Sequence, residues 1–230
     1  MENEFYTGYG CYRKHLYVKD EWMGKRINLE FQGVFQETEV YVNGKMAGDH
    51  KGGYTAFLID ITDYVQVGEN LVFVRVNNLW NPRIAPRAGE HVFNGGIYRD
   101  VAVLVTDPVH IAWYGTWIIT PEVSKESAAV EIRTELENQS LNGQKNEQER
   151  YQLVSVIRYE GKEVGCIESD CYLEAGAKIE VMKKIHISQP HLWSPENPAL
   201  YEVESILLRQ NQDCLLYTFS EPTRLLSISY

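Results

Sequence analysis

Apolar and polar side chains alternate along several short segments of the first hundred residues. These segments are residues 12–18, 26–31, 38–42 and 71–76. Alternation with a period of two is typical of a strand that buries one of its faces. Asn43-Gly44 follows the third segment, and this dipeptide favours a tight hairpin because both residues accept a positive φ. The pattern therefore predicts short antiparallel strands and no helical repeat.

The second half of the chain continues the strand pattern after a break at Thr106-Asp107-Pro108. A proline cannot continue a ladder of backbone hydrogen bonds, so this tripeptide is the expected joint between two domains. Further strands are expected over residues 109–119, 128–136, 151–159, 178–187 and 200–209. Short strands at this spacing are typical of an immunoglobulin-like sandwich. We predict an all-β chain with domains over residues 1–107 and 108–219, followed by an atypical tail, 220–230.

Composition and charge exclude several classes of partner. Aromatic residues make up 12% of the chain, which suits strands, and the formal net charge is −10. An acidic chain repels phosphate backbones, so no nucleic acid partner is expected. No apolar run approaches the roughly 18 residues of a membrane span, so no membrane partner is expected either. Met1-Glu2-Asn3-Glu4 lacks the order of a signal peptide, which leaves the compartment open, with the cytoplasm as the default and the periplasm as the alternative if the native N-terminus is longer.

Metal and cofactor chemistry has little support in the sequence. The six histidines show no close pairing of the metal-ligand type, and the four cysteines are too sparse for a zinc site or a disulfide framework. The glycine pairs lack the spacing of a phosphate-binding loop. We expect neither a metal ion nor a cofactor.

Residues 77–94 interrupt the strand pattern. They combine asparagines, prolines, a tryptophan and charged residues without alternation. A loop longer than about 12–15 residues in a compact domain is often functional. This segment is therefore the first candidate for a binding site.

Six segments, in order along residues 6–219, resemble the front part of glycoside hydrolase family 2, which contains β-galactosidases, β-glucuronidases and β-mannosidases. They are YRK (12–14); GKR (24–26) with LEF (29–31) and GV (33–34); VYVNG (40–44); GDHKGGY (48–54); GGIYRDV (95–101); and LWSPENPALY (192–201). The resemblance implies a jelly-roll sugar-binding domain followed by an immunoglobulin-like domain. Their Gly, Pro and aromatic residues are those that turns and cores require, so the motifs indicate the fold and do not mark a catalytic site.

The resemblance also gives residues 77–94 an expected role. In the family a loop of the first domain contacts the sugar in the active site. Amide groups suit sugar hydroxyls, and a tryptophan ring can stack on a pyranose. The candidate sugar-binding residues are Asn78, Trp80, Asn81, Arg83, Glu90 and His91, with Asn77 and Arg87 beside them. The alternative is a loop whose asparagines form turns and whose tryptophan packs on its own domain.

The catalytic part of the family is missing from this sequence. Family members carry two catalytic glutamates in a (β/α)₈ barrel, and such a barrel takes about 250 residues, more than the 230 of this chain. We therefore expect no catalytic residue and no activity of this chain alone. We also expect a truncated enzyme whose first strands are absent, which leaves a sheet edge through which a homodimer could form.

Three interpretations remain open. The chain is the non-catalytic front portion of a β-galactosidase-like family 2 glycosidase, with weak affinity for a galactoside-like carbohydrate. Alternatively it is a free-standing carbohydrate-binding module, or a scaffold protein whose sugar site has decayed. Fold-level resemblance alone does not decide between them.

Overall fold

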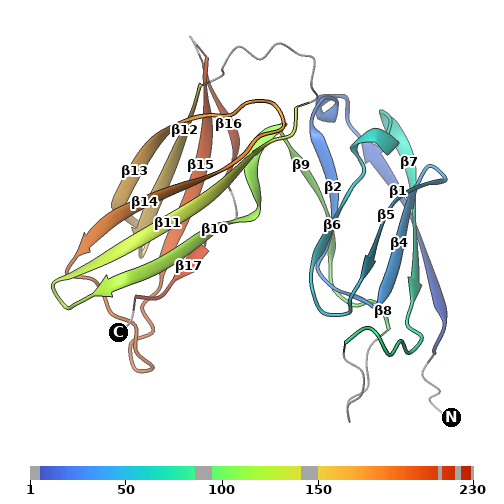
Figure 1. The fold of residues 1–230 in the computed structure, drawn as a ribbon, viewed down its shortest axis with the longest axis horizontal. Coiled ribbons are helices and arrows are strands. Elements are labelled where there is room, and N and C mark those ends of the chain that lie inside the picture. The colour runs from blue at the N-terminus through green and yellow to red at the C-terminus, as the bar shows by residue number, and fades with distance from the viewer. Residues whose placement is uncertain (1–5, 86–94, 141–149, 212–213, 221–223, 229–230) are drawn as a thin grey trace. The chain divides into compact units, whose positions relative to one another are not determined.

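The structure is a computed structural model that describes residues 6–85, 95–140, 150–211, 214–220 and 224–228. The chain divides into two compact units, Met1–Val105 and Thr106–Tyr230. Each is built from antiparallel β-strands (Figure 1). In the part of the chain described, no helix is long and apolar enough to cross a membrane.

The first unit is a sandwich of two main sheets. Their strand orders are β1-β7-β4-β5 and β6-β2-β9, and a small third sheet pairs β3 with β8. The strands are β1 (Tyr9–Val18), β2 (Arg26–Phe31), β3 (Val34–Phe35), β4 (Glu37–Val42), β5 (Lys45–Lys51), β6 (Phe57–Asp60), β7 (Gly68–Asn77), β8 (Gly96–Ile97) and β9 (Val101–Thr106). Two 3₁₀ turns, η1 (Asp20–Trp22) and η2 (Thr62–Tyr64), lie in the connections.

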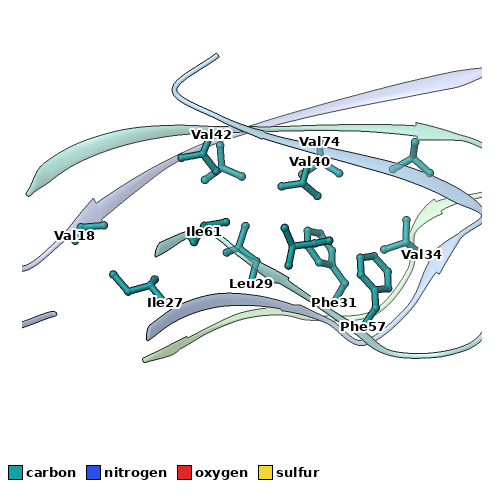
Figure 2. Close-up of a cluster of buried hydrophobic side chains, with 13 residues drawn as sticks. Val18, Ile27, Leu29, Phe31, Val34, Val40, Val42, Phe57, Ile61 and Val74 are labelled. Carbon is teal, nitrogen blue, oxygen red and sulfur yellow. The ribbon is translucent and has the colours of Figure 1, made fainter. Parts of the chain in front are cut away.

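The core of the first unit lies between the two main sheets (Figure 2). Alternate residues of β2 and β4 supply much of it, because successive side chains of a strand point to opposite faces. Ile27 and Phe31 are each 1% exposed, and Val40 and Val42 are fully buried. The hydrophobic periodicity of the sequence thus corresponds to the inward faces of these strands.

The β4–β5 hairpin fixes where the functional loops lie. Asn43 and Gly44 form its tip with φ values of 51° and 81°, as the sequence predicts. The pairing then sets Glu37 opposite Lys51, while the pairing of β4 with β7 sets Glu37 opposite Asn77. Glu37 therefore lies between the end of β5 and the end of β7.

The second unit has two sheets of its own, with orders β10-β11-β14 and β13-β12-β15-β16. The strands are β10 (Val109–Val123), β11 (Ser127–Asn138), β12 (Arg150–Tyr159), β13 (Lys162–Tyr172), β14 (Lys178–Ser188), β15 (Tyr201–Asn211), β16 (Cys214–Ser220) and β17 (Arg224–Leu226). Two clusters of buried apolar side chains fill it, one around Ile132, Ile157 and Tyr201 and the other around Leu136 and Leu207. The all-β class and the sandwich architecture predicted from the sequence are confirmed.

The segment that we separated as a tail takes part in this unit. β17 pairs with β15, with Leu226 opposite Tyr201. Leu226 is 7% exposed and Ile228 is fully buried, and the Trp193 backbone N–H donates to the Ile228 carbonyl at 2.7 Å. Residues 224–228 therefore contribute both a strand and core side chains to the second unit.

Candidate functional site

Glu37 holds the segment that follows β7. One of its carboxylate oxygens accepts a hydrogen bond from the Asn77 side-chain amide and the other from the Asn81 side-chain amide, each at 2.8 Å. Hydrogen bonds to a charged acceptor are roughly twice as strong as bonds between neutral groups. The carboxylate of β4 thus fixes both ends of the turn that carries Trp80.

The same asparagines also shape their own backbone. The Asn77 side-chain oxygen accepts from the Leu79 N–H and the Asn81 side-chain oxygen from the Arg83 N–H, both at 3.0 Å. These are Asx turns, in which the side chain substitutes for a backbone acceptor. The amide groups of both residues are therefore engaged within the first unit before any ligand arrives.

Asn78 faces the N-terminal approach to β1. Its side-chain oxygen accepts from the Gly8 N–H at 2.7 Å, and its amide donates to the Tyr6 carbonyl at 2.9 Å. Trp80 is 71% exposed, and it is not among the residues that line either hollow described below. Of the candidates predicted from the sequence, Arg87, Glu90 and His91 lie outside the described residues.

A hollow of about 880 Å³ lies beside this segment, which we call the Lys51–Arg83 hollow. One side of the hollow is formed by the turn after β5, and the other side by the Asx turn of Asn81 and the residues that follow it. Among the residues that the structure describes, the lining consists of Lys51, Gly52, Gly53, Tyr54, Thr55, Asn81, Arg83, Ile84 and Ala85. Asn81 and Arg83 therefore share one hollow with residues 51–55, which the sequence did not suggest as binding residues.

The turn from β5 to β6 requires glycine at two positions. Gly52 has a φ of 148°, where residues with a Cβ are strained, and a Cβ on Gly53 would clash with the buried ring of Phe35. The Tyr98 hydroxyl donates to the Gly53 carbonyl at 2.6 Å and anchors the turn. This close packing keeps Tyr54 at the surface, where 58% of it is exposed.

Two aromatic groups around the turn have shifted pKa values. Burial lowers the pKa of His50, whose ring stacks on Phe57 with 4.0 Å between the ring centroids. Its imidazole is therefore neutral at pH 7. Partial burial raises the pKa of the Tyr54 phenol, so its hydroxyl stays protonated and can both donate and accept hydrogen bonds.

A second hollow, of about 320 Å³, is acidic. Its lining includes three carboxylates, of Glu37, Glu39 and Asp49, and two cations, Lys51 and Arg75, so Lys51 lines both hollows. Arg75 donates to both carboxylate oxygens of Glu39, at 2.9 and 2.7 Å. Hydrogen bonds from Arg75 and from the Tyr41 hydroxyl hold the pKa of Glu39 below its usual range. A carboxylate bound in this way is a poor proton donor, whereas an acid catalyst needs a raised pKa.

Asn81 and Arg83, which the sequence suggested as sugar-binding residues, line the Lys51–Arg83 hollow, whereas Lys51, Tyr54 and Thr55 line it without having been suggested, and Glu37 binds Asn81 beside it. The sequence signal for the missed residues was the Gly52-Gly53 pair, which marks a tight turn that displays its neighbours. Within the described part of the chain, no group of three or more His, Cys, Asp and Glu side chains could hold a metal ion.

Comparison with protein families assigns both units. The model of the "Glycosyl hydrolases family 2, sugar binding domain" matches residues 2–108, and a second model, "Glycosyl hydrolases family 2", matches residues 109–217. The first unit is thus the jelly-roll domain of this family, and the second is its immunoglobulin-like domain.

Individual relatives agree with this assignment. The chain is 38% identical to a beta-glucuronidase of Bacteroides fragilis over 208 residues, covering 87% of this chain and 29% of that protein. It is 31% identical to a beta-galactosidase of Thermoanaerobacter pseudethanolicus over 228 residues, covering 97% of this chain and 29% of that protein. The crystal structure of a Bacteroides uniformis beta-glucuronidase superposes with a TM-score of 0.87 at 31% identity, over 97% of this chain and 26% of that one. The chain spans less than a third of each of these proteins and belongs to glycoside hydrolase family 2.

Proposed function

We propose that this chain is the non-catalytic N-terminal portion of a family 2 glycoside hydrolase. In this role it supports sugar recognition and acts as a scaffold for a catalytic barrel. The observation that carries the proposal is the Lys51–Arg83 hollow, which lies in the unit matched by the sugar-binding domain model. An exposed tyrosine ring, a threonine hydroxyl and donor side chains are the groups that bind sugars.

The chemistry of the two hollows supports a non-catalytic role. Retaining hydrolysis of a glycoside needs two carboxyl groups about 5–5.5 Å apart, one acting as acid and base and the other as nucleophile. The lining of the Lys51–Arg83 hollow includes no Asp or Glu among the residues described. In the acidic hollow, Glu39 is bound to Arg75, and both oxygens of Glu37 accept from asparagines. Neither carboxylate is poised to donate a proton or to attack a sugar.

Hydrolysis of a panel of chromogenic β-glycosides by the purified full chain tests the non-catalytic role. We include a β-galactoside and a β-glucuronide, because both activities occur among the named relatives. We expect no turnover above the buffer rate. Turnover that co-purifies with the chain and disappears in Glu37→Gln or Asp49→Asn would overturn the proposal, because it would make the acidic hollow an active site.

Saccharide titration of the isotope-labelled chain, followed by NMR, tests sugar recognition and separates the alternatives. We expect weak binding that shifts backbone amide signals of residues 52–55 and 81–85. Tight binding without any barrel would favour a free-standing carbohydrate-binding module. Unchanged spectra at the highest saccharide concentrations would favour a scaffold with a decayed site.

A further inference from the structure

Gln36 lies between the two sides of the Lys51–Arg83 hollow and is not itself among the lining residues. The turn side of the hollow is formed by residues 51–55, and the loop side by residues 81–85, which begin two residues after Leu79. Gln36 directly precedes β4, and only 2% of it is exposed. Its carbonyl accepts a hydrogen bond from the Gly52 N–H at 2.9 Å, and its side-chain amide donates to the Leu79 carbonyl at 2.5 Å. One buried residue is therefore bonded to both sides.

The two neighbours of Gln36 each reach one side through their side chains. The ring of Phe35 lies edge-on to the ring of Tyr54, with 5.8 Å between the centroids, and so contacts the turn side. The Glu37 carboxylate accepts from the Asn81 amide on the loop side. Gln36 differs from both, because its backbone is bonded to the turn side and its side chain to the segment that leads into the loop side.

The main chain of Gln36 is itself fixed to the sheet. Its N–H donates to the carbonyl of Asn77, at the end of β7, at 3.1 Å. Coupling between two segments is carried by rigid, hydrogen-bonded connections, and a residue held at three points is such a connection. A ligand that contacts both sides then loses less affinity to the ordering of the loop side, because that side is already in place.

We propose that Gln36 is a positioning residue that couples the two sides of the Lys51–Arg83 hollow, so that a ligand held at the turn side finds the loop side aligned with it. The inference deepens the proposed sugar recognition and rests on it for the ligand. The coupling itself belongs to the unliganded chain and can be measured there.

Hydrogen exchange in the unliganded full chain tests the positioning role. The amide protons of Leu79 and Arg83 report the segment, because each is bonded to an asparagine side chain in an Asx turn. In Gln36→Met, which keeps the length of the side chain but removes its donor, both should exchange about fivefold faster, the effect of one hydrogen bond. Amides of the β2–β6 pairing should keep their rates, whereas a merely structural role of Gln36 would raise rates throughout the first unit.

A second substitution measures the coupling between the sides. Thr55→Gly loosens the turn side at an exposed position and should speed exchange of the Leu79 amide about twofold in the parent chain. In the Gln36→Met background the same substitution should add nothing at Leu79, because the connection is already broken. An equal effect of Thr55→Gly in both backgrounds would overturn the coupling.

Titration with methyl β-D-galactoside, followed by NMR, tests the effect on a ligand. The dissociation constant should rise about fivefold in Gln36→Met, although Gln36 is not a lining residue. The matched control is Gln32→Met, the same substitution at an exposed glutamine between β2 and β3, which should keep the parent value.

Gln36→Glu provides a rescue that depends on pH. At this buried position the introduced carboxyl is largely protonated at pH 5 and can donate like the amide, whereas at pH 8 it is ionised and cannot. Relative to the parent chain at the same pH, both the Leu79 exchange rate and the dissociation constant should be near the parent values at pH 5 and near those of Gln36→Met at pH 8. A variant that behaves alike at both pH values would contradict the role of the donated hydrogen bond.

The outcomes separate this inference from the proposed function. Unchanged exchange at Leu79 in Gln36→Met, or faster exchange throughout the first unit, would overturn the coupling and leave sugar recognition standing. The expected exchange rates in a chain that binds no saccharide would overturn sugar recognition and leave the coupling standing.

Discussion

Glu37 links three parts of the first unit through one carboxylate. It belongs to β4, it pairs across the sheet with Asn77 at the end of β7, and it reaches Asn81 beyond the strand. The two asparagines would each lose a charged acceptor without it. Glu37 is therefore a positioning residue for the turn of Trp80 and for the Asn81 side of the hollow.

Glu37→Gln should destabilise the first unit. The substitution keeps the shape of the side chain but turns one acceptor oxygen into an amide donor that faces another donor. We expect a loss of about 1–3 kcal/mol in the free energy of unfolding, measured by chemical denaturation. Glu21→Gln, at an exposed position paired with Lys19, is the control and should change stability by less than about 0.5 kcal/mol. Equal effects of the two substitutions would contradict the positioning role.

Glu131 makes the stability of the second unit depend on pH. Its side chain is buried, and it lies 2.6 Å from an Arg133 terminal nitrogen and 3.4 Å from the Lys184 ammonium. Hydrogen bonds from Arg133, and then from Lys184, lower the pKa of Glu131. A carboxyl whose pKa is lowered by folding stabilises the folded state above its unfolded pKa, and that stabilisation is lost as the pH falls.

As the pH falls, we expect the free energy of unfolding to decrease more steeply in the parent chain than in the Glu131→Gln variant. The stabilisation should be complete above about pH 5 and should decline below about pH 4.3, the usual pKa of a glutamate. Thermal unfolding of both proteins between about pH 6 and pH 3 measures this difference. Parallel stability curves over the whole range would show that Glu131 does not contribute.

At the scale of elements, strands β1 and β9 end the two main sheets of the first unit. They flank a hollow of about 430 Å³ whose lining includes the core residues Leu29 and Phe31. Val101, in β9, is 43% exposed at its rim. Lys14 lies opposite the buried Val72, on the inner face of β1, where a charge discourages further pairing. The edge thus combines apolar surface with a cation that limits which strands can add to it.

Association of two copies through this edge, which the sequence led us to expect, stays a prediction. Light scattering at rising protein concentration should show a mass approaching twice that of the chain. Val101→Lys adds a charge to the apolar rim at an exposed position and should return the mass to that of one chain. A monomer mass for the parent chain at every concentration would contradict the prediction.

The elements that the sequence predicted are those whose information is local. Apolar and polar residues alternate within residues 26–31 and again within 38–42, and each of these segments lies in a strand of its own. Asn43-Gly44 likewise specifies its turn without help from distant residues. β17 was missed because it is three residues long and the residues of β15 that pair with it, 201–203, lie more than twenty residues earlier. So short a segment carries no periodic pattern, and tertiary pairing alone gives it a strand conformation.

The residues of the candidate site also divide into those that a local sequence pattern indicates and those that only tertiary pairing brings there. Asn81 and Arg83 could be proposed because they lie within one loop of unusual composition. Lys51 and Tyr54 come from a turn nearly thirty residues earlier, and the register of β5, β4 and β7 brings them near that loop. Hydrophobic periodicity shows which residues of one strand point to the same face of a sheet, but it does not show which strands become neighbours in that sheet.

At the scale of the whole molecule, each unit has a hydrophobic core made from its own residues. Cluster residues of the first unit run from Leu16 to Val105, and those of the second run from Val109 to Ile228. A unit with its own core unfolds as its own cooperative transition when that core supplies most of its stability. We therefore predict two transitions in calorimetry.

A matched pair of core substitutions assigns the transitions. Ile27 is 1% exposed in the first unit and Ile157 is fully buried in the second. Replacement of either by valine removes one methylene and should cost about 1 kcal/mol. For units of this size, which lie between the small and the large domains surveyed, that lowers the midpoint by about 3–6 °C. Ile27→Val should move one transition and Ile157→Val the other.

A ligand provides an independent check on the same assignment. The lining residues of the Lys51–Arg83 hollow that the structure describes all belong to the first unit, so a saccharide bound there should stabilise that unit. Its addition should raise the midpoint that Ile27→Val lowers and leave the midpoint that Ile157→Val lowers unchanged. A single transition that both substitutions lower equally would mean that the two cores unfold together. The stability of the hollow would then depend on the immunoglobulin-like unit, although none of the lining residues that the structure describes belongs to that unit.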